Sequence, residues 1–346
     1  KTVYASSGIS GLGNEEITLS PPGSAAAADL NTINDATTAL VTATGVTALT
    51  GTASELVTLI NNEGNAGDKV NLDGDFAVTI TDTPTSTQLE IIDAATAGAI
   101  SYGSDKDVTV TDQSVTASYL NTLDGDTTGT VNASAVTMIT GTTSEIKTVY
   151  TSSGISGLGN EEITLSAGSA AATDLTAIDA ATTKVVDGNL VTTVTGTTAA
   201  IAAAAIADAN GTLVLKADFG ATVDAGAVNA TDLSTISGRT SATVDATGAT
   251  AINGSAADVA AALADTEISH TSTFDVTLAD GTAAATDLTA IDAATIKAVD
   301  GNLVTTVTGT AAAIAAAATA DANGTIVLKA DFGATVDVGA VNATDL

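Results

Sequence analysis

Cysteine and tryptophan are absent from the 346-residue sequence, and aromatic residues together make up only 2% of it. Without cysteine the chain forms neither a disulfide framework nor a thiolate metal site. Large cores usually draw much of their buried area from aromatic side chains. Hydrophobic residues reach 45% and are mostly Ala, Val, Leu and Ile. The composition therefore predicts a thin core of small aliphatic side chains in regular layers.

Basic residues are also scarce: 9 Lys and Arg stand against 40 Asp and Glu, which gives a formal net charge of −31. Nucleic-acid phosphates and anionic membrane surfaces both attract Lys and Arg, so we expect this chain to bind neither. No run of about 18 apolar residues is free of charge, so we expect no membrane span. An acidic chain instead suits solubility in salt or the binding of cations.

Known catalytic motifs are missing as well. His270 is the only histidine, so it has no partners for a zinc site and no evident Ser–His–Asp constellation. The phrase "GISGLG" occurs at Gly8 and Gly154, but Leu12 and Leu158 occupy the second glycine position of a G-x-S-x-G elbow. Its glycines are spaced G-x-x-G-x-G, which is the reverse of the G-x-G-x-x-G loop of dinucleotide-binding proteins. We therefore expect a corner between repeats here, and a protein that is not an enzyme.

What the sequence does contain is long internal duplication. The stretch "KTVYASSGISGLGNEEITLS" at 1–20 returns at 147–166 with a single exchange, and 168–233 matches 281–346 at 59 of 66 positions. The two offsets, 146 and 113 residues, differ. The unit that is being duplicated must therefore be shorter than either.

That shorter unit is marked by one aliphatic residue in a "DL"-like context, which we call the anchor. The anchors are Leu30, Leu56, Leu89, Leu120, Ile146, Leu175, Ile201, Leu233, Val259, Leu288, Ile314 and Leu346. Their spacings are 26, 33, 31, 26, 29, 26, 32, 26, 29, 26 and 32 residues. A fixed period of this size predicts a repeat architecture.

Each anchor lies in a predicted short helix. Thr52 precedes Glu55 by three residues, and Thr142 precedes Glu145 in the same way, which is the pattern of a capping box. In another repeat Asp258 favours the helix start through the helix dipole. The apolar residues that follow the anchors fit one face of a helix of two to three turns.

Strand-like segments follow each helix. Examples are "KVVDGNLVTTVTGT" from Lys184, "DFAVTITDT" from Asp75 and "TFDVTLADGT" from Thr273. Val and Thr alternate in them, as in a strand with one buried face and one solvated face. Each repeat is therefore predicted to contain a short capped helix, a turn and one or two short strands.

One repeat cannot bury its apolar face alone, but stacked repeats can. Parallel strands joined by helix-containing crossovers are overwhelmingly right-handed. The predicted fold is a right-handed parallel β-solenoid of α/β type, with a short capped helix per repeat of roughly 26–33 residues. The alternation of 26 with longer spacings leaves open whether a coil holds one helix or two.

We expect 1–346 to form one continuous array, a window on a longer polypeptide. Neither end has the pattern of a cap, and uncapped sheet edges grow by pairing with further strands. The predicted partner is therefore the protein itself, by end-to-end or lateral assembly.

Calcium is the one cofactor that the sequence suggests, the alternative being none. Pairs of acidic or amide side chains lie close to a glycine in "NLDGDF", "TLDGDT" and both copies of "ADANGT", and hard cations prefer such oxygen clusters. Asp-Gly and Asn-Gly are also common tight-turn dipeptides, so turn chemistry is the competing interpretation. The candidate calcium ligands are Asp73, Asp75, Asp124, Asp126, Asp208 and Asp321.

Phrases such as "AATDLTAIDAAT" from Ala171, "VTTVTGT" from Val191 and "GSAADVAAALAD" from Gly254 resemble the large Ala-, Thr-, Gly- and Asp-rich repeat proteins of bacterial cell surfaces, notably cyanobacterial ones. The resemblance extends along the whole chain. It implies an extracellular or cell-surface adhesin, surface-layer or fibre component, in contact with a cell surface or a polysaccharide.

The leading hypothesis is an extracellular structural protein that forms a filament or cell-surface fibre by stacking solenoid repeats. The alternative is a calcium-stiffened stalk of a giant adhesin or surface-layer protein. A polysaccharide-processing β-helix is a third hypothesis, which the scarcity of Lys, Arg and His disfavours.

Overall fold

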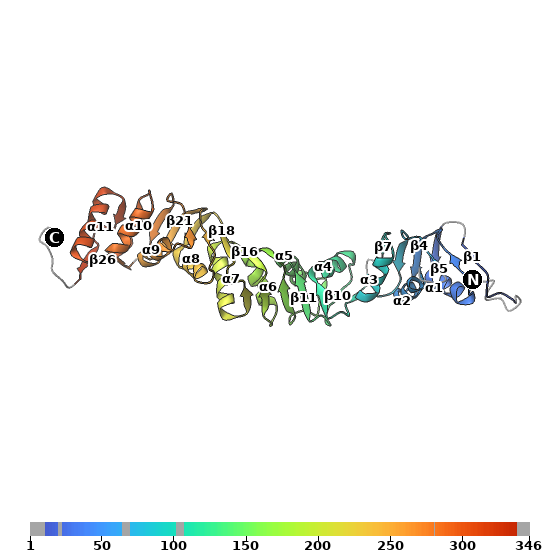
Figure 1. Cartoon of the computed structure of the whole chain (residues 1–346). Coiled ribbons are helices and arrows are strands. Elements are labelled where there is room, and N and C mark those ends of the chain that lie inside the picture. The colour runs from blue at the N-terminus through green and yellow to red at the C-terminus, as the bar shows by residue number, and fades with distance from the viewer. Residues whose placement is uncertain (1–10, 20–22, 64–69, 102–106, 280, 338–346) are drawn as a thin grey trace. The chain divides into compact units, whose positions relative to one another are not determined.

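The computed structural model describes residues 11–19, 23–63, 70–101, 107–279 and 281–337. Within them the chain repeats an order of short strands followed by one helix (Figure 1). The chain divides into two compact bodies, which we describe separately: residues 1–140 with 148–161, and residues 141–147 with 162–346. That 1–346 is one continuous array stays a prediction.

The first body contains four helices within its described residues, and the helix α5 spans the boundary between the bodies. The helices are α1 Ala27–Ala36, α2 Ala53–Asn61, α3 Ser86–Ala95, α4 Ala117–Asp126 and α5 Thr143–Thr151. The strands are β1 Ile17–Thr18, β2 Gly23–Ala26, β3 Val41–Thr42, β4 Val46–Gly51, β5 Val70–Asn71, β6 Ala77–Ile80, β7 Ile100–Ser101, β8 Val108–Thr109, β9 Ser114–Thr116, β10 Val131–Asn132, β11 Met138–Gly141 and β12 Ile155–Ser156. They pair in the orders β1-β3-β5, β2-β4-β6-β7, β8-β10-β12 and β9-β11.

The second body continues the same order of elements. Its helices are α6 Ala172–Ala181, α7 Thr198–Asn210, α8 Ala230–Ser237, α9 Ala256–Ala264, α10 Ala285–Ala294 and α11 Ala311–Asn323. The strands are β13 Glu162–Leu165, β14 Gly168–Ala171, β15 Val186–Gly188, β16 Val191–Gly196, β17 Leu213–Leu215, β18 Gly220–Val223, β19 Gly226–Asn229, β20 Val244–Asp245, β21 Ala249–Gly254, β22 Ile268–Ser269, β23 Asp275–Leu278, β24 Gly281–Ala284, β25 Val299–Gly301, β26 Val304–Gly309, β27 Ile326–Leu328 and β28 Gly333–Val336. They pair in the orders β13-β15-β17, β14-β16-β18-β20-β22, β19-β21-β23-β25-β27 and β24-β26-β28.

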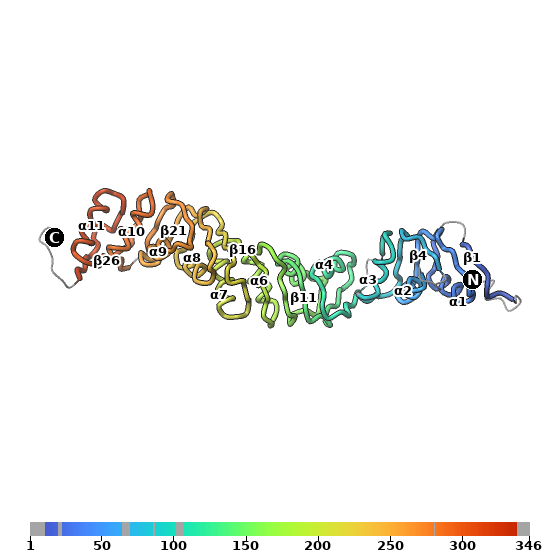
Figure 2. The backbone as a smooth tube through the Cα atoms, viewed as in Figure 1, coloured from blue at the N-terminus to red at the C-terminus, as the bar shows by residue number. Residues whose placement is uncertain are grey.

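The register of the parallel strands shows how repeats follow one another. Val41 pairs with Val70 in the first body, and Val186 pairs with Leu213 in the second. Each partner lies one repeat further along the chain, with a single helix, α2 or α7, in between. Figure 2 traces the backbone of each body through these successive repeats. The repeat is therefore an α/β unit with one helix. The sequence alone had left open whether each repeat contains one helix or two.

The alternating spacing of the anchors corresponds to two kinds of repeat in the second body. The 26-residue spacing from Leu175 to Ile201 contains two strands, β15 and β16. The 32-residue spacing from Ile201 to Leu233 contains three strands, β17 to β19. The additional strand is β19, and it begins a new sheet. The strands β14 and β24 begin new sheets in the same way. A new sheet therefore starts at every second repeat.

The helices form where the anchors predict them. Each anchor from Leu30 to Ile314 is the fourth residue of a helix, and all of them are buried apart from Ile314, which is half-buried. Leu346 lies outside the described residues, as do residues 1–10 and 20 of the first duplicated stretch. No helix within the described ranges is long and apolar enough to cross a membrane.

The helix caps are also as predicted. The Thr52 side chain accepts a hydrogen bond from the Glu55 backbone N–H, and the Glu55 carboxylate accepts one from the Thr52 N–H. Thr142 and Glu145 form the same pair of bonds. A third capping box, between Thr85 and Gln88 at α3, was not predicted, because an amide replaces the expected acid.

Threonines lie just after six of the described helices, α1, α3, α4, α6, α8 and α10, and all of them are buried except Thr96, which is half-buried. The Thr295 hydroxyl, just after α10, donates to the Phe274 carbonyl oxygen at 2.8 Å and accepts from the Lys297 N–H at 3.1 Å. Related threonines, each of which accepts a hydrogen bond from the N–H two residues on, are Thr37, Thr96, Thr127, Thr182 and Thr240. These positions could not be distinguished in the sequence, because threonine is abundant throughout the chain.

Burial of a repeat depends on the repeat that follows it. The sequence "GATV" forms both β18 and β28. In β18, which pairs with β20, Val223 is 5% exposed, whereas Val336 of β28 is 39% exposed. The two strands have identical sequences, so the difference in burial comes from the neighbouring strand and helix and not from composition.

We predict that Thr240→Val lowers the free energy of unfolding by roughly 1–3 kcal/mol. The valine keeps the shape but leaves the Phe219 carbonyl and the Ala242 N–H without their partner. Urea unfolding followed by circular dichroism measures the change. Thr243→Val, at an exposed position three residues away, is the control and changes the value by no more than about 0.5 kcal/mol. Equal effects of the two variants would contradict a role for the buried hydroxyl.

The cap of α5 should be sensitive to acid. Hydrogen bonds from the Thr142 backbone N–H and hydroxyl lower the pKa of Glu145 below 4.5. A lowered folded-state pKa means that the stabilisation is present above the unfolded pKa and is lost as the pH falls through the folded pKa. We expect hydrogen-exchange protection of the first turn of α5 to fall below about pH 4.5 in the native chain. Glu145→Gln, which keeps a capping acceptor, should show no such fall.

Candidate functional site

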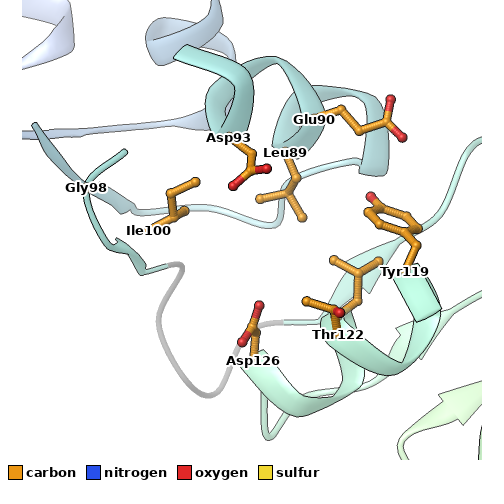
Figure 3. A pocket seen from close by; sticks show the side chains of 9 residues that line it. Leu89, Glu90, Asp93, Gly98, Ile100, Tyr119, Thr122 and Asp126 are labelled. Carbon is orange, nitrogen blue, oxygen red and sulfur yellow. The ribbon is translucent and has the colours of Figure 1, made fainter. Parts of the chain in front are cut away.

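The first body contains a cavity of about 450 Å³ between α3 and α4 (Figure 3). Its lining residues are Leu89, Glu90, Asp93, Gly98, Ile100, Tyr119, Thr122, Leu123 and Asp126. Leucine and isoleucine side chains form an apolar surface within it, and among the lining residues that the structure describes none is basic. A volume of this size is typical of small-molecule sites.

Two carboxylates face this cavity from opposite walls. Asp93 projects from α3 and Asp126 from the last turn of α4, and in Figure 3 both point into the space between the helices. The Glu90 carboxylate points away from it. Gly98 forms part of the wall where the chain passes close to the previous strand, because an added Cβ would lie 2.3 Å from the Phe76 carbonyl oxygen.

The position of Asp93 recurs in other repeats, four residues after the anchor. At that position Asp124 accepts a hydrogen bond from the Ser152 hydroxyl at 2.7 Å. Asp179 accepts one from Thr212 at 3.0 Å, and Asp292 accepts one from Thr325 at 3.1 Å.

In each case the hydroxyl lies just after the next helix and ties the two repeats together. For Asp93, no such bond is found within the part of the chain that the structure describes. The chain continues after α3 into α4, and the carboxylate of Asp126 faces Asp93 across the cavity instead.

The structure does not bring the six candidate calcium ligands together. Asp73 and Asp75 are exposed on either side of Gly74, in the turn between β5 and β6. Within the described ranges, no three His, Cys, Asp or Glu side chains are placed so that they could hold a metal ion. Calcium binding at Asp73 and Asp75 stays a prediction.

The turn predicted at "TLDGDT" is wrong. Asp124 and Asp126 lie in the last turn of α4, because Leu120 and Leu123 pack into the core at helical spacing and carry the helix through Gly125. The two carboxylates consequently point to different parts of the structure. Asp124 bonds to Ser152, whereas Asp126 faces the cavity.

Asp208 and Asp321 lie near the ends of α7 and α11, and each carboxylate bonds to the backbone of the strand that follows its helix. The Asp208 carboxylate accepts the Leu215 N–H at 2.9 Å, and Asp321 accepts the Leu328 N–H at 2.7 Å. Asp208 also forms an ion pair with Arg239. The predicted turn is present, since Gly211 ends α7 with φ of 77°, a left-handed conformation that glycine adopts readily.

The corner at the second "GISGLG" contains a buried acid that the sequence did not distinguish from its neighbour. Glu161 is 3% exposed. Its carboxylate accepts hydrogen bonds from the Gly159 and Asn160 N–H groups and from the Tyr150 hydroxyl at 2.8 Å. Glu162 is exposed, so the two adjacent acids do lie on opposite faces. His270 is half-buried and packs edge-on against Phe274.

Comparison with models of protein families, with curated protein sequences and with solved structures finds no match for this chain. The likeness to bacterial surface repeat proteins therefore stays a prediction from the sequence.

The calcium prediction can be tested at Asp73 and Asp75. If calcium binds there, added calcium raises the melting temperature of the native chain and a chelator reverses the rise, because ligand binding stabilises the folded state. The double variant Asp73→Asn with Asp75→Asn should lose that response. Asp35→Asn, which removes a charge from an exposed position on α1, is the control and should leave the response to calcium intact. A native chain indifferent to calcium would contradict the prediction.

Proposed function

We propose that this protein is an extracellular structural protein whose repeats stack into a filament or cell-surface fibre. In this proposal the repeats form a right-handed parallel β-solenoid, and length is what the protein supplies. The handedness rests on the general rule for parallel strands joined by helix-containing crossovers.

The observation that carries the proposal is that successive repeats bury one another. Val223 of β18, which pairs with β20, is 5% exposed, and Ile201 of α7 is 1% exposed. Equivalent strands of neighbouring repeats pair in parallel, as Val186 does with Leu213. Repeats that bury one another in this way form an array that can be lengthened by further repeats of the same kind.

The charge of the chain supports growth in one direction only. Asp and Glu exceed Lys and Arg by 31, and like charges on the sides of neighbouring molecules repel one another. Side-to-side packing is therefore disfavoured, while stacking through the apolar faces is not. Thin separate filaments are the expected form.

The second candidate function is a calcium-stiffened stalk of an adhesin or surface-layer protein. The exposed pair Asp73 and Asp75 favours it, because two carboxylates on one short turn suit a hard cation. It shares the repeat architecture with the first candidate and differs from it in depending on calcium.

Electron microscopy of the purified chain tests the proposal. We expect uniform filaments with an axial repeat near a multiple of about 4.8 Å, the spacing of paired strands. Val336→Lys places a charge at the position in β28 that Val223 occupies in β18, where the next repeat covers it, and should abolish filaments. Val185→Lys, at a site that is 52% exposed elsewhere in the second body, is the matched control and should leave them unchanged. Discrete particles formed by the native chain would overturn the proposal.

A further inference from the structure

Five asparagines in the described ranges lie in an Asn-x-Ser/Thr sequence, which is the acceptor pattern for N-linked glycans. They are Asn132, Asn210, Asn229, Asn253 and Asn323. A pattern this short also arises by chance in a chain rich in threonine, so the pattern alone assigns no site. What separates the five is the role of the hydroxyl residue that lies two positions after each asparagine.

Two of the five have a hydroxyl that joins neighbouring repeats. Asn210 is followed by Thr212, whose hydroxyl donates to the Asp179 carboxylate at 3.0 Å. The copy of this sequence at Asn323 makes the same bond at 3.1 Å. The fold accounts for both threonines without a glycan.

The hydroxyl after Asn253 caps a helix. Ser255 is the N-cap of α9, and its hydroxyl accepts the Asp258 N–H at 3.1 Å and donates to the Asp258 carboxylate at 2.6 Å. Asn253 itself is half-buried. The fold accounts for this sequence as well.

At Asn132 and Asn229 the hydroxyl has no such role. Ser134 and Thr231 are exposed, and their hydroxyls form no hydrogen bond within the part of the chain that the structure describes. In both cases the alanine between the asparagine and the hydroxyl residue is 0% exposed. Because that alanine is anchored in the core, the two side chains on either side of it both face solvent.

The amide of each of these two asparagines is also oriented. The Asn132 Oδ1 accepts the Ser134 backbone N–H at 3.1 Å, and the Asn229 Oδ1 accepts the Thr231 N–H at 2.8 Å. Since the oxygen is held against the chain, the Nδ2 nitrogen is turned away from it. The strand ends at each asparagine, β10 at Asn132 and β19 at Asn229, so the acceptor lies where the chain changes direction.

We propose that Asn132 and Asn229 are attachment sites for N-linked glycans. In the reaction Nδ2 forms a bond to the anomeric carbon of a sugar that is carried on a lipid diphosphate. The bond from that carbon to the phosphate oxygen breaks, the lipid diphosphate leaves with the electron pair, and the amide loses one proton. Occurrence of the modification in the cell rests on the proposed function, because such glycans belong to the surface of secreted proteins.

Both sites lie where a glycan leaves the pairing of repeats intact. Asn132 stands in register with Thr109 and Ser156 of the neighbouring strands, and all three are exposed. Asn229 stands in register with Asn253. A bulky, hydrated group at these positions covers the side of the array, and it adds to the negative charge in keeping neighbouring filaments apart.

Enzymatic transfer to the folded chain tests the proposal. The purified full chain is incubated with an oligosaccharyltransferase and a lipid-linked oligosaccharide, and its peptides are mapped by mass spectrometry. We expect the mass of the glycan on Asn132 and Asn229 and not on Asn210 or Asn323. Peptides of the digested chain, in which the bonds of the fold are lost, should be modified at Asn210 and Asn323 as well.

Two outcomes of this mapping would overturn the proposal. One is a folded chain that stays unmodified at Asn132 and Asn229 while its peptides are modified. The other is transfer to Asn210 in the folded chain to the same extent as to Asn132. The reaction is carried out with purified components, so its result does not depend on whether the chain forms filaments, and a failure of the proposed function is recognised separately by electron microscopy.

Matched variants distinguish specific transfer from a change in folding. Ser134→Ala and Thr231→Ala keep the asparagine and remove the hydroxyl, so each should abolish transfer to its own site, leave the other site modified and leave the melting temperature unchanged. Thr212→Ala is the control: it removes the bond to Asp179 and should lower the melting temperature without changing transfer to Asn132 or Asn229. Transfer that persists in Ser134→Ala or Thr231→Ala would show labelling without recognition of the acceptor sequence and overturn the proposal.

Discussion

The burial of each repeat by its neighbour is the constraint on which the rest of the structure depends. The core side chains are mostly Ala, Val, Leu and Ile, with Phe76, Phe219 and Phe274 also buried, and a single repeat of two or three short strands and one helix is too thin to enclose them alone. Parallel pairing brings the same position of successive repeats side by side, so that Val186 lies next to Leu213. The threonines after the helices form hydrogen bonds to backbone groups, and the acid–hydroxyl bonds join side chains of neighbouring repeats. Stability is accordingly local, and each step of the array can be judged by itself.

Much of this arrangement can be predicted from the sequence because it depends on local patterns. The anchors mark the fourth residue of each helix, since the cap four residues before the anchor and the apolar spacing after it are both short-range signals. The strands follow from alternating Val and Thr. The helix through Gly125 was not predicted, because an Asp-Gly-Asp sequence favours a turn locally and only the burial of Leu120 and Leu123 overrides that preference.

The cavity could not be predicted from any one motif. Its residues come from α3, the loop that follows it, β7 and α4, and none of them forms a recognisable pattern alone. The signal that does point to it is the succession of two long spacings, 33 and 31, which gains meaning only once the two kinds of repeat are known. The partners of Asp124, Asp179 and Asp292 likewise lie about thirty residues away. Contacts between residues this far apart in the sequence can be predicted only once the register of the strands is known.

In the second body, the start of a new sheet at every second repeat gives the repeats a parity. Adding or removing two neighbouring repeats keeps long and short repeats in alternation, whereas a change by one places two of the same kind in contact. The duplication of 113 residues spans four anchors, an even step, whereas the duplication of 146 residues spans five, an odd step that includes the irregular spacing around Leu89. Genetic changes in the length of such a chain should therefore survive mostly in even steps, and an odd step leaves a lasting gap of the kind found between α3 and α4.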